Sequence, residues 1–537
     1  MAIPRQVPGA IHCLRAASQM NNLETIPSIT GFGRPLTSVW RIGLGLGAVA
    51  WLALVVAATL AYPGNRVEFL VFVFLYTVMA ALALPRPRLY GYTFLAGFLF
   101  FGFCAKSIAF LSLGIALVEP TGRFNGSGHA WDSALLPAIA GSAAVVTIRL
   151  VHLVTRRVKP GPASPFSLPP PAWFLRMRSP VLVASWGSIL LLNGLNFLLA
   201  FYQIGVIPRL VLPAHLSVII EWLFVAGLAM WASTLVGWQA QSSQLASALL
   251  IPFGEALASL STLSRSAFLF RALSYLLVVA NFPAFFRSQL TRRWHVLLLM
   301  LVLVGFVVSI AAVTLLRTVV YPLDSSQTPA IAARPTSTPV AISASTPTPV
   351  ASPAAVTPVR NTTSRLNLAV REIGVLVVGR WIGIEGTMAV SSYPGLGIDT
   401  FRRALTESPS LGETAFYQRL AGSSYHTSGR YEFLTTPGAI AILEYSGSLA
   451  VVAMGMALIT ALLIAFELAA SHLLGNALTV SVVALTLANA VVQMQFPYLF
   501  LVFLAEQAVA LVALGVLSRG ISRHPGRVPE TAFSTTE

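Results

Sequence analysis

Charged residues are scarce in this sequence. Only 10% of its 537 residues are Asp, Glu, Lys or Arg, whereas 56% are hydrophobic. About a quarter of the residues of an ordinary soluble domain are charged, so this composition excludes that class. Because one membrane crossing needs about 20 consecutive apolar residues, the chain is long enough for about a dozen crossings. We therefore expect an all-α polytopic membrane protein.

Cysteine and lysine are nearly absent. Cys13 and Cys104 are too few and too far apart for a disulfide framework or a cysteine-based metal site. Lys106 and Lys159 are the only lysines, so the net charge of +16 comes almost wholly from arginine. The sequence also has no Walker motif, no kinase or hydrolase signature and no His/Glu cluster with zinc spacing. We expect neither a metal nor another cofactor.

Long apolar runs bounded by polar residues, Pro or Gly predict twelve membrane-spanning helices. The seventh run is the least apolar. The runs lie near residues 42–62, 67–84, 90–118, 133–154, 180–202, 217–238, 244–262, 267–285, 295–316, 439–466, 476–494 and 498–517.

The basic residues predict the orientation of these helices. If the amino terminus is cytoplasmic, seventeen Lys and Arg residues fall in cytoplasmic segments, and the short outer loops hold only Arg66, Arg123, Arg209 and Arg265. Cytoplasmic loops of membrane proteins carry such an excess. We expect both termini in the cytoplasm. This placement explains the net charge without a nucleic-acid partner.

One long segment, residues 317–440, interrupts the pattern as a periplasmic loop between the ninth and tenth predicted helices. Its residues 324–360 are rich in Pro, Ser, Thr and Ala, which predicts a disordered or extended linker. Its residues 361–440 are predicted to be helical and to carry the active site, with Gly422 as a helix stop. We therefore expect the chain to consist of five parts. They are a cytoplasmic amino-terminal tail at 1–41, membrane helices in 42–316, the loop at 317–440, membrane helices in 441–517 and a cytoplasmic carboxy-terminal tail at 518–537.

Ionisable side chains inside predicted spans are costly and indicate either a functional site or a buried pair. Lys106 lies near the middle of the third predicted helix, which leaves a structural pair and a substrate contact as alternatives. For Glu467 and Glu506 we favour structural pairing. The full set is Lys106, Glu221, Glu255, Arg271, Glu444, Glu467 and Glu506.

Two arginines near the outer end of the eighth predicted helix suit a lipid-linked diphosphate. Arg265 follows Ser264 at the helix start, and Arg271 lies about 9 Å further along the helix. A guanidinium offers fixed bidentate geometry to phosphate oxygens and keeps its charge. The alternative for Arg265 is an interfacial anchor. The two side chains are roughly 120° apart around the helix, so they need not face one cavity.

The loop supplies further candidates. Arg380 precedes Trp381, and Trp381 and Glu385 would share one face of a helix because they are four residues apart. An interfacial belt is the alternative for Arg380 and Trp381. Asp399 and His426 follow in the loop, and ordinary solvation is the alternative for the histidine.

These motifs together resemble the superfamily of bacterial O-antigen polymerases (Wzy-type) and O-antigen ligases. The resemblance covers residues 240–515 and rests on the Ser-Arg-Ser element at 264–266, Arg380-Trp381, the Pro-x-x-Gly stretch at 394–397 and the Glu-x-x-Gly stretch at 444–447. It implies a metal-independent, GT-C-like membrane glycosyltransferase of the bacterial inner membrane that acts on undecaprenyl-diphosphate-linked oligosaccharides at the periplasmic face. It also implies that Arg265 and Arg380 hold the diphosphate of the donor.

The sequence departs from the superfamily at one position, and this departure decides between a polymerase and a ligase. Ligases carry a His nine residues before the Glu that enters the following helix, but nine residues before Glu444 lies Thr435, and His426 is nine residues earlier still. We therefore expect a polymerase of oligosaccharide repeat units, with a ligase as the alternative. A transporter or flippase would predict inverted repeats, which the sequence does not display.

The proposed roles follow from the reaction. Direct displacement at the anomeric carbon would invert its configuration, and the incoming hydroxyl needs a base, for which we favour Glu385 over Asp399 and His426. We assign catalytic roles to Arg265, Arg380 and Glu385, and further partners would be a chain-length regulator and a flippase of the same pathway. We assign substrate binding to Arg271, Lys106, Asp399, His426 and Glu444.

Overall fold

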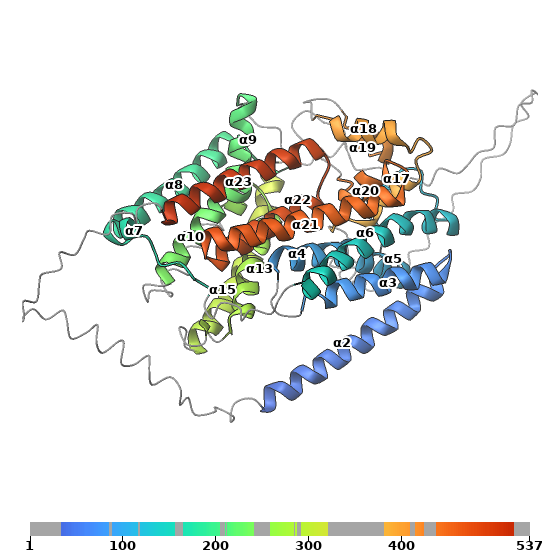
Figure 1. Cartoon of the computed structure of the whole chain (residues 1–537), viewed down its shortest axis with the longest axis horizontal. Coiled ribbons are helices and arrows are strands. Elements are labelled where there is room, and N and C mark those ends of the chain that lie inside the picture. Colours follow the sequence, from blue (N-terminus) through green and yellow to red (C-terminus); the bar gives the residue numbers. More distant parts are fainter. Residues whose placement is uncertain are drawn as a thin grey trace, which may run out of the picture. The chain divides into compact units, whose positions relative to one another are not determined.

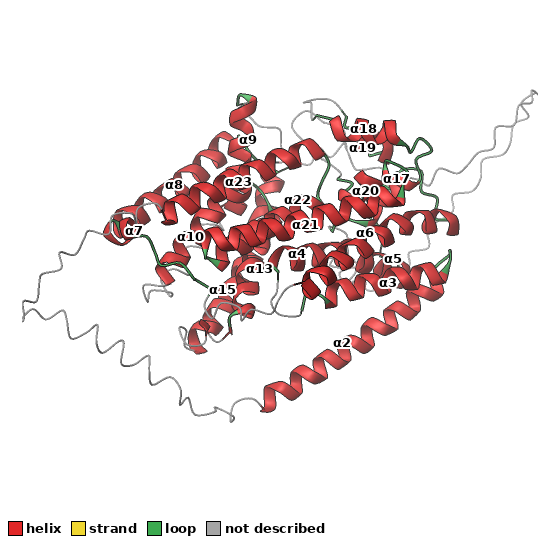
Figure 2. Cartoon of the chain, viewed as in Figure 1, coloured by secondary structure: helices red, strands yellow, loops and turns green. Residues whose placement is uncertain are grey.

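The computed structural model describes part of the chain. The described residues are 34–84, 89–115, 117, 119–155, 165–204, 210, 212–240, 258–283, 285–286, 292–320, 381–408, 414–423 and 436–519. Within them the regular structure is helical, and the only β contact is an isolated bridge between Phe166 and Asn476 (Figure 2). The predicted all-α class is confirmed for this part of the chain.

The chain divides into two units, Met1–Ala57 and Ala58–Glu537. The described residues of the first unit form most of α2, and the remaining helices belong to the second unit (Figure 1). In chain order the helices are α2 (Arg34–Ala61), α3 (Arg66–Ala81), α4 (Tyr90–Leu99), η2 (Phe100–Ala105), α5 (Lys106–Leu113), α6 (Gly128–Thr155), α7 (Ala172–Arg176), α8 (Arg178–Leu199), α9 (Ala214–Trp222), η3 (Leu223–Gly227), α10 (Leu228–Ala240), α13 (Arg265–Asn281), α15 (Arg292–Val320), α17 (Ile384–Ser391), α18 (Ile398–Thr406), α19 (Phe416–Ala421), α20 (Ala439–Glu444), α21 (Leu449–Leu474), α22 (Ala477–Val492) and α23 (Pro497–Arg519).

Several helices are long and apolar enough to cross a bilayer. Among the described residues six stretches qualify: Tyr90–Leu113, Gly128–Thr155, Arg178–Leu199, Leu216–Ala240, Leu449–Leu474 and Pro497–Arg519. Shorter apolar helices occupy Gly45–Ala61, Ala267–Asn281, Val302–Leu316 and Ala477–Val492. The chain therefore has the helices of a membrane-embedded protein. The predicted total of twelve spans stays a prediction, and most of the seventh span, 244–262, lies outside the described residues.

The second unit has buried helices at its centre and other helices with exposed apolar faces. Helix α22 is buried along most of its length and packs against α4, α10, α13 and α21. In contrast, α8, α21 and α23 expose Val183, Leu458 and Val509, and more than half of each of these side chains is accessible. Apolar faces of this extent are unfavourable in water, so they identify the surface that lipid tails cover.

Two predicted helix ends differ from the structure. The third predicted helix ends at Leu113 because Gly114 adopts a left-handed conformation with φ of 64°. The tenth predicted helix, 439–466, is wrong as a single element, since a turn at Tyr445–Ser448 separates α20 from α21. Gly447 has φ of 68° within this turn, a conformation that favours glycine.

Glu467 joins α21 to the start of α4. Its carboxylate accepts hydrogen bonds from the backbone N–H groups of Tyr90 and Gly91, at 2.7 Å each. The first N–H groups of a helix have no partner within the helix and carry partial positive charge. Glu467 therefore has a structural role, as predicted, because it binds the N-terminus of α4.

Candidate functional site

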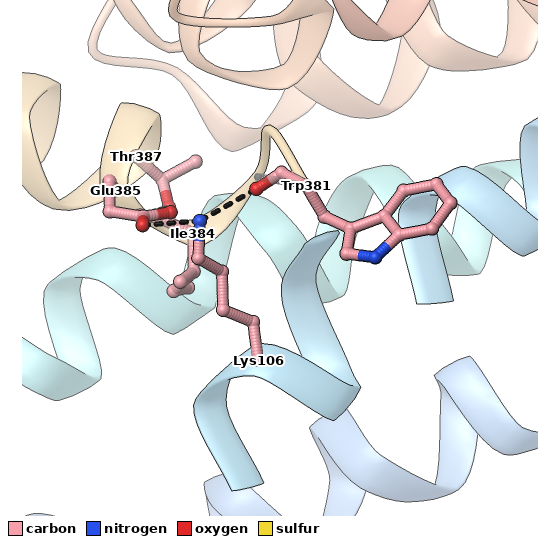
Figure 3. Close-up of polar contacts among 5 residues, drawn as sticks. All are labelled: Lys106, Trp381, Ile384, Glu385 and Thr387. Atoms are coloured by element: carbon pink, nitrogen blue, oxygen red, sulfur yellow. Dashed lines mark hydrogen bonds and ion pairs between the residues drawn. The ribbon is translucent and has the colours of Figure 1, made fainter. Parts of the chain in front are cut away.

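Lys106 fixes a segment of the long loop, residues 381–385, inside the helix bundle. Its ammonium forms an ion pair with Glu385 and donates a hydrogen bond to the carbonyl oxygen of Trp381 at 2.6 Å (Figure 3). Lys106 and Glu385 are each only 2% exposed. The Trp381 ring stacks on Phe101, with ring centroids 5.0 Å apart. Lys106 thus binds residues from both ends of this segment.

The close approach of two backbones explains the glycines in this contact. A Cβ atom at Gly383 would overlap the carbonyl oxygen of Gly102, and a Cβ atom at Gly102 would overlap the carbonyl oxygen of Ile382. Gly102 lies in η2, a π-helical stretch between α4 and α5. Glycine at both positions therefore lets the loop reach the π-helical stretch and places Glu385 beside Lys106.

The prediction that Trp381 and Glu385 share a helix face is wrong. Helix α17 begins at Ile384, with Gly383 as its N-cap, so Trp381 lies outside the helix. The two residues nevertheless converge, because Lys106 contacts the backbone of one and the side chain of the other. Burial raises the pKa of Glu385 above its ordinary value, although the neighbouring ammonium opposes the rise.

Glu444 holds a second contact between loop segments. Its Oε1 accepts a hydrogen bond of 2.5 Å from the Ser391 hydroxyl at the end of α17. Its Oε2 is buried and has no hydrogen-bond partner among the described residues. Burial raises the pKa of Glu444 well above its ordinary value and so favours its neutral form. The hydrogen bond from Ser391 joins α17 to α20.

A cavity of about 420 Å³ lies in another part of the second unit. Its walls come from α9, η3, α13, α22 and α23, and from the turn that follows α22. Three ionisable side chains line it together with neutral polar groups and aromatic rings. They are Arg271, Glu221 and Glu506, with Ser264, Thr436, Thr486, Asn489, Gln493, Gln495, Trp222, Phe270 and Phe500 among the other lining residues.

Arg271 connects two walls of this cavity. It lies in α13, is 8% exposed, and its Nη2 donates a hydrogen bond of 3.0 Å to the carbonyl oxygen of Phe224 in η3. At the start of α13 the Ser264 hydroxyl accepts a hydrogen bond from the backbone N–H of Ala267. Ser264 and Ala267 also line the cavity, so its wall includes the positive end of the helix dipole.

The structure brings only some of the predicted site residues together. Lys106 and Glu385 form the buried pair, and neither lines the cavity that contains Arg271. Asp399 is exposed in the first turn of α18. Glu444 is buried against Ser391, outside the cavity lining.

Three predictions fall partly or wholly outside the described residues. Arg265 is the first residue of α13, and only its backbone position is described. Arg380 and His426 lie outside the described ranges altogether. The roles assigned to Arg265, Arg380 and His426 remain predictions.

The cavity also contains two residues for which no chemical role was predicted. Glu221 was noted only as an ionisable residue within a span, and Glu506 was expected to be in a structural pair. Both line the cavity with Arg271. Their positions in the sequence could have indicated a role in a site, because each lies seven to nine residues after the start of an apolar helix.

The chain was compared with models of protein families, with curated proteins and with solved structures. None of the three comparisons gives a match.

Proposed function

We propose that the chain is a membrane-embedded glycosyltransferase that polymerises lipid-linked oligosaccharide repeat units at the periplasmic face of the bacterial inner membrane. The donor is an undecaprenyl-diphosphate-linked glycan, and the products contribute to O-antigen, exopolysaccharide or capsule. The observation that carries the proposal is the cavity, which Arg271 lines together with Glu221, Glu506 and neutral polar and aromatic side chains.

Arg271 suits the departing group of this reaction. When the anomeric C–O bond breaks, the lipid diphosphate leaves with additional negative charge. A guanidinium keeps its positive charge at any working pH and offers two parallel N–H donors to phosphate oxygens. Preorganised charge of this kind stabilises a transition state without reorganisation at the moment of reaction.

The helix that carries Arg271 supports the same assignment. The first turn of α13 lines the cavity, and the N–H groups of a helix start favour anions. We propose Arg265, the first residue of this helix, as a second contact to the diphosphate. Arg380 is proposed as a third, because it directly precedes the Trp381 segment that Lys106 fixes.

The remaining lining suits a saccharide. The volume falls within the roughly 300–1,000 Å³ of common small-molecule sites. The side-chain amides of Asn489, Gln493 and Gln495 can both donate and accept hydrogen bonds, as sugar hydroxyls require. Aromatic rings such as Phe270 and Phe500 offer flat apolar surfaces for the C–H faces of sugar rings.

Two other functions would use the same cavity. A ligase would differ only in its acceptor, and Thr435 in place of the ligase histidine ranks it second. A transporter is favoured by one observation, the carboxylates Glu221 and Glu506 in membrane-spanning helices, since such groups are typical of ion and proton pathways.

One experiment distinguishes the three functions. Purified protein in liposomes is given a single lipid-linked oligosaccharide, and both glycan length and movement across the bilayer are recorded. We expect chain growth. Transfer only to a different acceptor would identify a ligase, and movement without a new glycosidic bond would identify a transporter.

Variants of Arg271 test the cavity itself. We expect Arg271→Ala to lower the rate of chain growth about 100- to 1,000-fold, by analogy with the loss of one preorganised charge-stabilising donor. Arg271→Lys should retain an intermediate rate because it keeps the charge and loses the bidentate geometry. Arg402→Ala, at an exposed position of α18, is the matched control and should leave the rate unchanged.

A further inference from the structure

The three ionisable groups of the cavity lie at similar depth. Helices α9, α13 and α23 all begin on the side of the membrane that the charge distribution predicts to be periplasmic. At 1.5 Å per residue, Glu221, Arg271 and Glu506 lie about 10, 9 and 14 Å beyond the starts of their helices. They therefore occupy one layer of the membrane, near its periplasmic side.

Arg271 is tied to the wall that carries Glu221. Its guanidinium bonds the carbonyl oxygen of Phe224, which belongs to the π-helical stretch η3. Glu221 lies two residues before η3 begins. Single π-helical turns inside α-helices are frequent at functional sites. The hydrogen bond fixes the guanidinium relative to the segment that positions Glu221.

Two carboxyl groups belong to the lining of the cavity. Glu221 is exposed and Glu506 is half-buried, and both line the cavity. They are also close enough to interact electrostatically. A carboxyl group at this depth in a bilayer is costly, and its contact with a polar cavity provides a place where a hydroxyl group can meet it.

Charge complementarity predicts which residues of the cavity bind the donor and which bind the acceptor sugar. A diphosphate is attracted by Arg271 and repelled by carboxylates. An acceptor sugar has no charge at its reacting hydroxyl, and a carboxylate is a strong acceptor for that hydroxyl group. The two carboxyl groups therefore suit the acceptor, and Arg271 suits the donor.

We propose that Glu221 is the base that receives the proton of the attacking acceptor hydroxyl, an inference that rests on the proposed glycosyltransferase function. The hydroxyl oxygen forms a bond to the anomeric carbon of the donor, and the bond from that carbon to the diphosphate oxygen breaks. The electron pair of the broken bond leaves with the diphosphate beside Arg271. The hydroxyl proton moves to the Glu221 carboxylate, which balances the step.

This assignment replaces Glu385 as the preferred base. Glu385 is held by Lys106 and does not line the cavity, whereas a base must come within hydrogen-bond reach of the hydroxyl. Glu506 acts as a positioning residue that binds a second hydroxyl of the acceptor sugar.

The test uses purified full-length protein and single-turnover chain growth on a lipid-linked oligosaccharide. We expect Glu221→Gln to lower the rate at least 100-fold, within the range for loss of a general base, and Glu221→Asp to retain part of it. The affinity for undecaprenyl diphosphate, the probe for the donor side, should change less than twofold. Glu506→Gln should raise KM for the acceptor about tenfold with a smaller effect on kcat.

The controls separate this inference from the proposed function. Glu68→Gln, the same substitution in α3 outside the cavity lining, should leave the rate unchanged. The rate of the wild type should rise with pH through one ionisation that Glu221→Gln lacks. If Glu221→Gln turns over within threefold of the wild type, Glu221 is not the base and the glycosyltransferase function stands. If the wild type forms no glycosidic bond, the function itself is wrong and the inference is overturned with it.

Discussion

The Lys106–Glu385 contact and the Arg271 cavity both place charged side chains inside a helical bundle, but they use the charge differently. In the first, opposite charges meet, and both side chains are almost fully removed from solvent. In the second, Arg271 bonds a backbone carbonyl and lines a cavity together with Glu221 and Glu506. The ion pair fixes a loop segment in place, whereas a charged group that lines a cavity is placed where a ligand can reach it.

The largest effect that tests this difference is expected at the ion pair. Lys106→Met should destabilise the protein by about 3–5 kcal/mol because it leaves a buried carboxylate without its cation. The double variant Lys106→Met/Glu385→Leu should recover most of that loss, since replacing both charges of a buried pair by apolar groups is often neutral. Thermal unfolding in detergent measures both. A single variant as stable as the wild type would mean that the pair does not fix the loop.

A smaller effect is expected at Glu444, a buried carboxyl group that pairs with a hydroxyl in place of a cation. Because burial raises its pKa in the folded protein, the folded state keeps a proton that the unfolded chain releases above about pH 4.5. Stability should therefore fall as pH rises above that value, by at most about 1.4 kcal/mol per pH unit. Melting temperatures measured between pH 5 and pH 8 report this slope.

The variant Glu444→Gln isolates the contribution of this residue. It removes the titrating group and keeps the shape of the side chain, so its melting temperature should depend less on pH than that of the wild type. An unchanged slope would show that Glu444 is ionised in the folded protein or that another group causes the dependence.

The smallest effect is expected at Asp399, which is exposed on α18. Asp399→Asn should change stability by no more than about 0.5 kcal/mol, as for most surface substitutions, and should change chain growth less than twofold. A large loss of activity with normal stability would move the reaction from the cavity to the loop surface.

The sequence predicts the helices better than their interruptions. Apolar runs between polar residues place most helices within a few residues, for example 180–202 against Arg178–Leu199. The helix break after Glu444 was not predicted, although Ser446, Gly447 and Ser448 follow it. The residues before and after these three are similarly apolar, so the composition predicts a single helix. The π-helical stretches η2 and η3 were missed too, since their residues are as apolar as their neighbours.

The candidate site could be predicted only in part, because its contacts join distant segments. The sequence identified Lys106 as too deep to reach the surface, but its contact with Trp381, 275 positions along the chain, depends on how the loop packs. The depth of Arg271 was predicted correctly as a position along a helix. Its place beside Glu221 and Glu506 depends on the packing of α9, α13 and α23, which periodicity does not encode.

The most direct test is a structure of the protein in lipid nanodiscs with a lipid-linked oligosaccharide bound, determined by electron cryomicroscopy. We expect the diphosphate within about 3 Å of the Arg271 guanidinium and sugar density extending from it toward Glu221. Diphosphate and sugar density outside the cavity, with Arg271 still bonded only to protein, would contradict the proposed site.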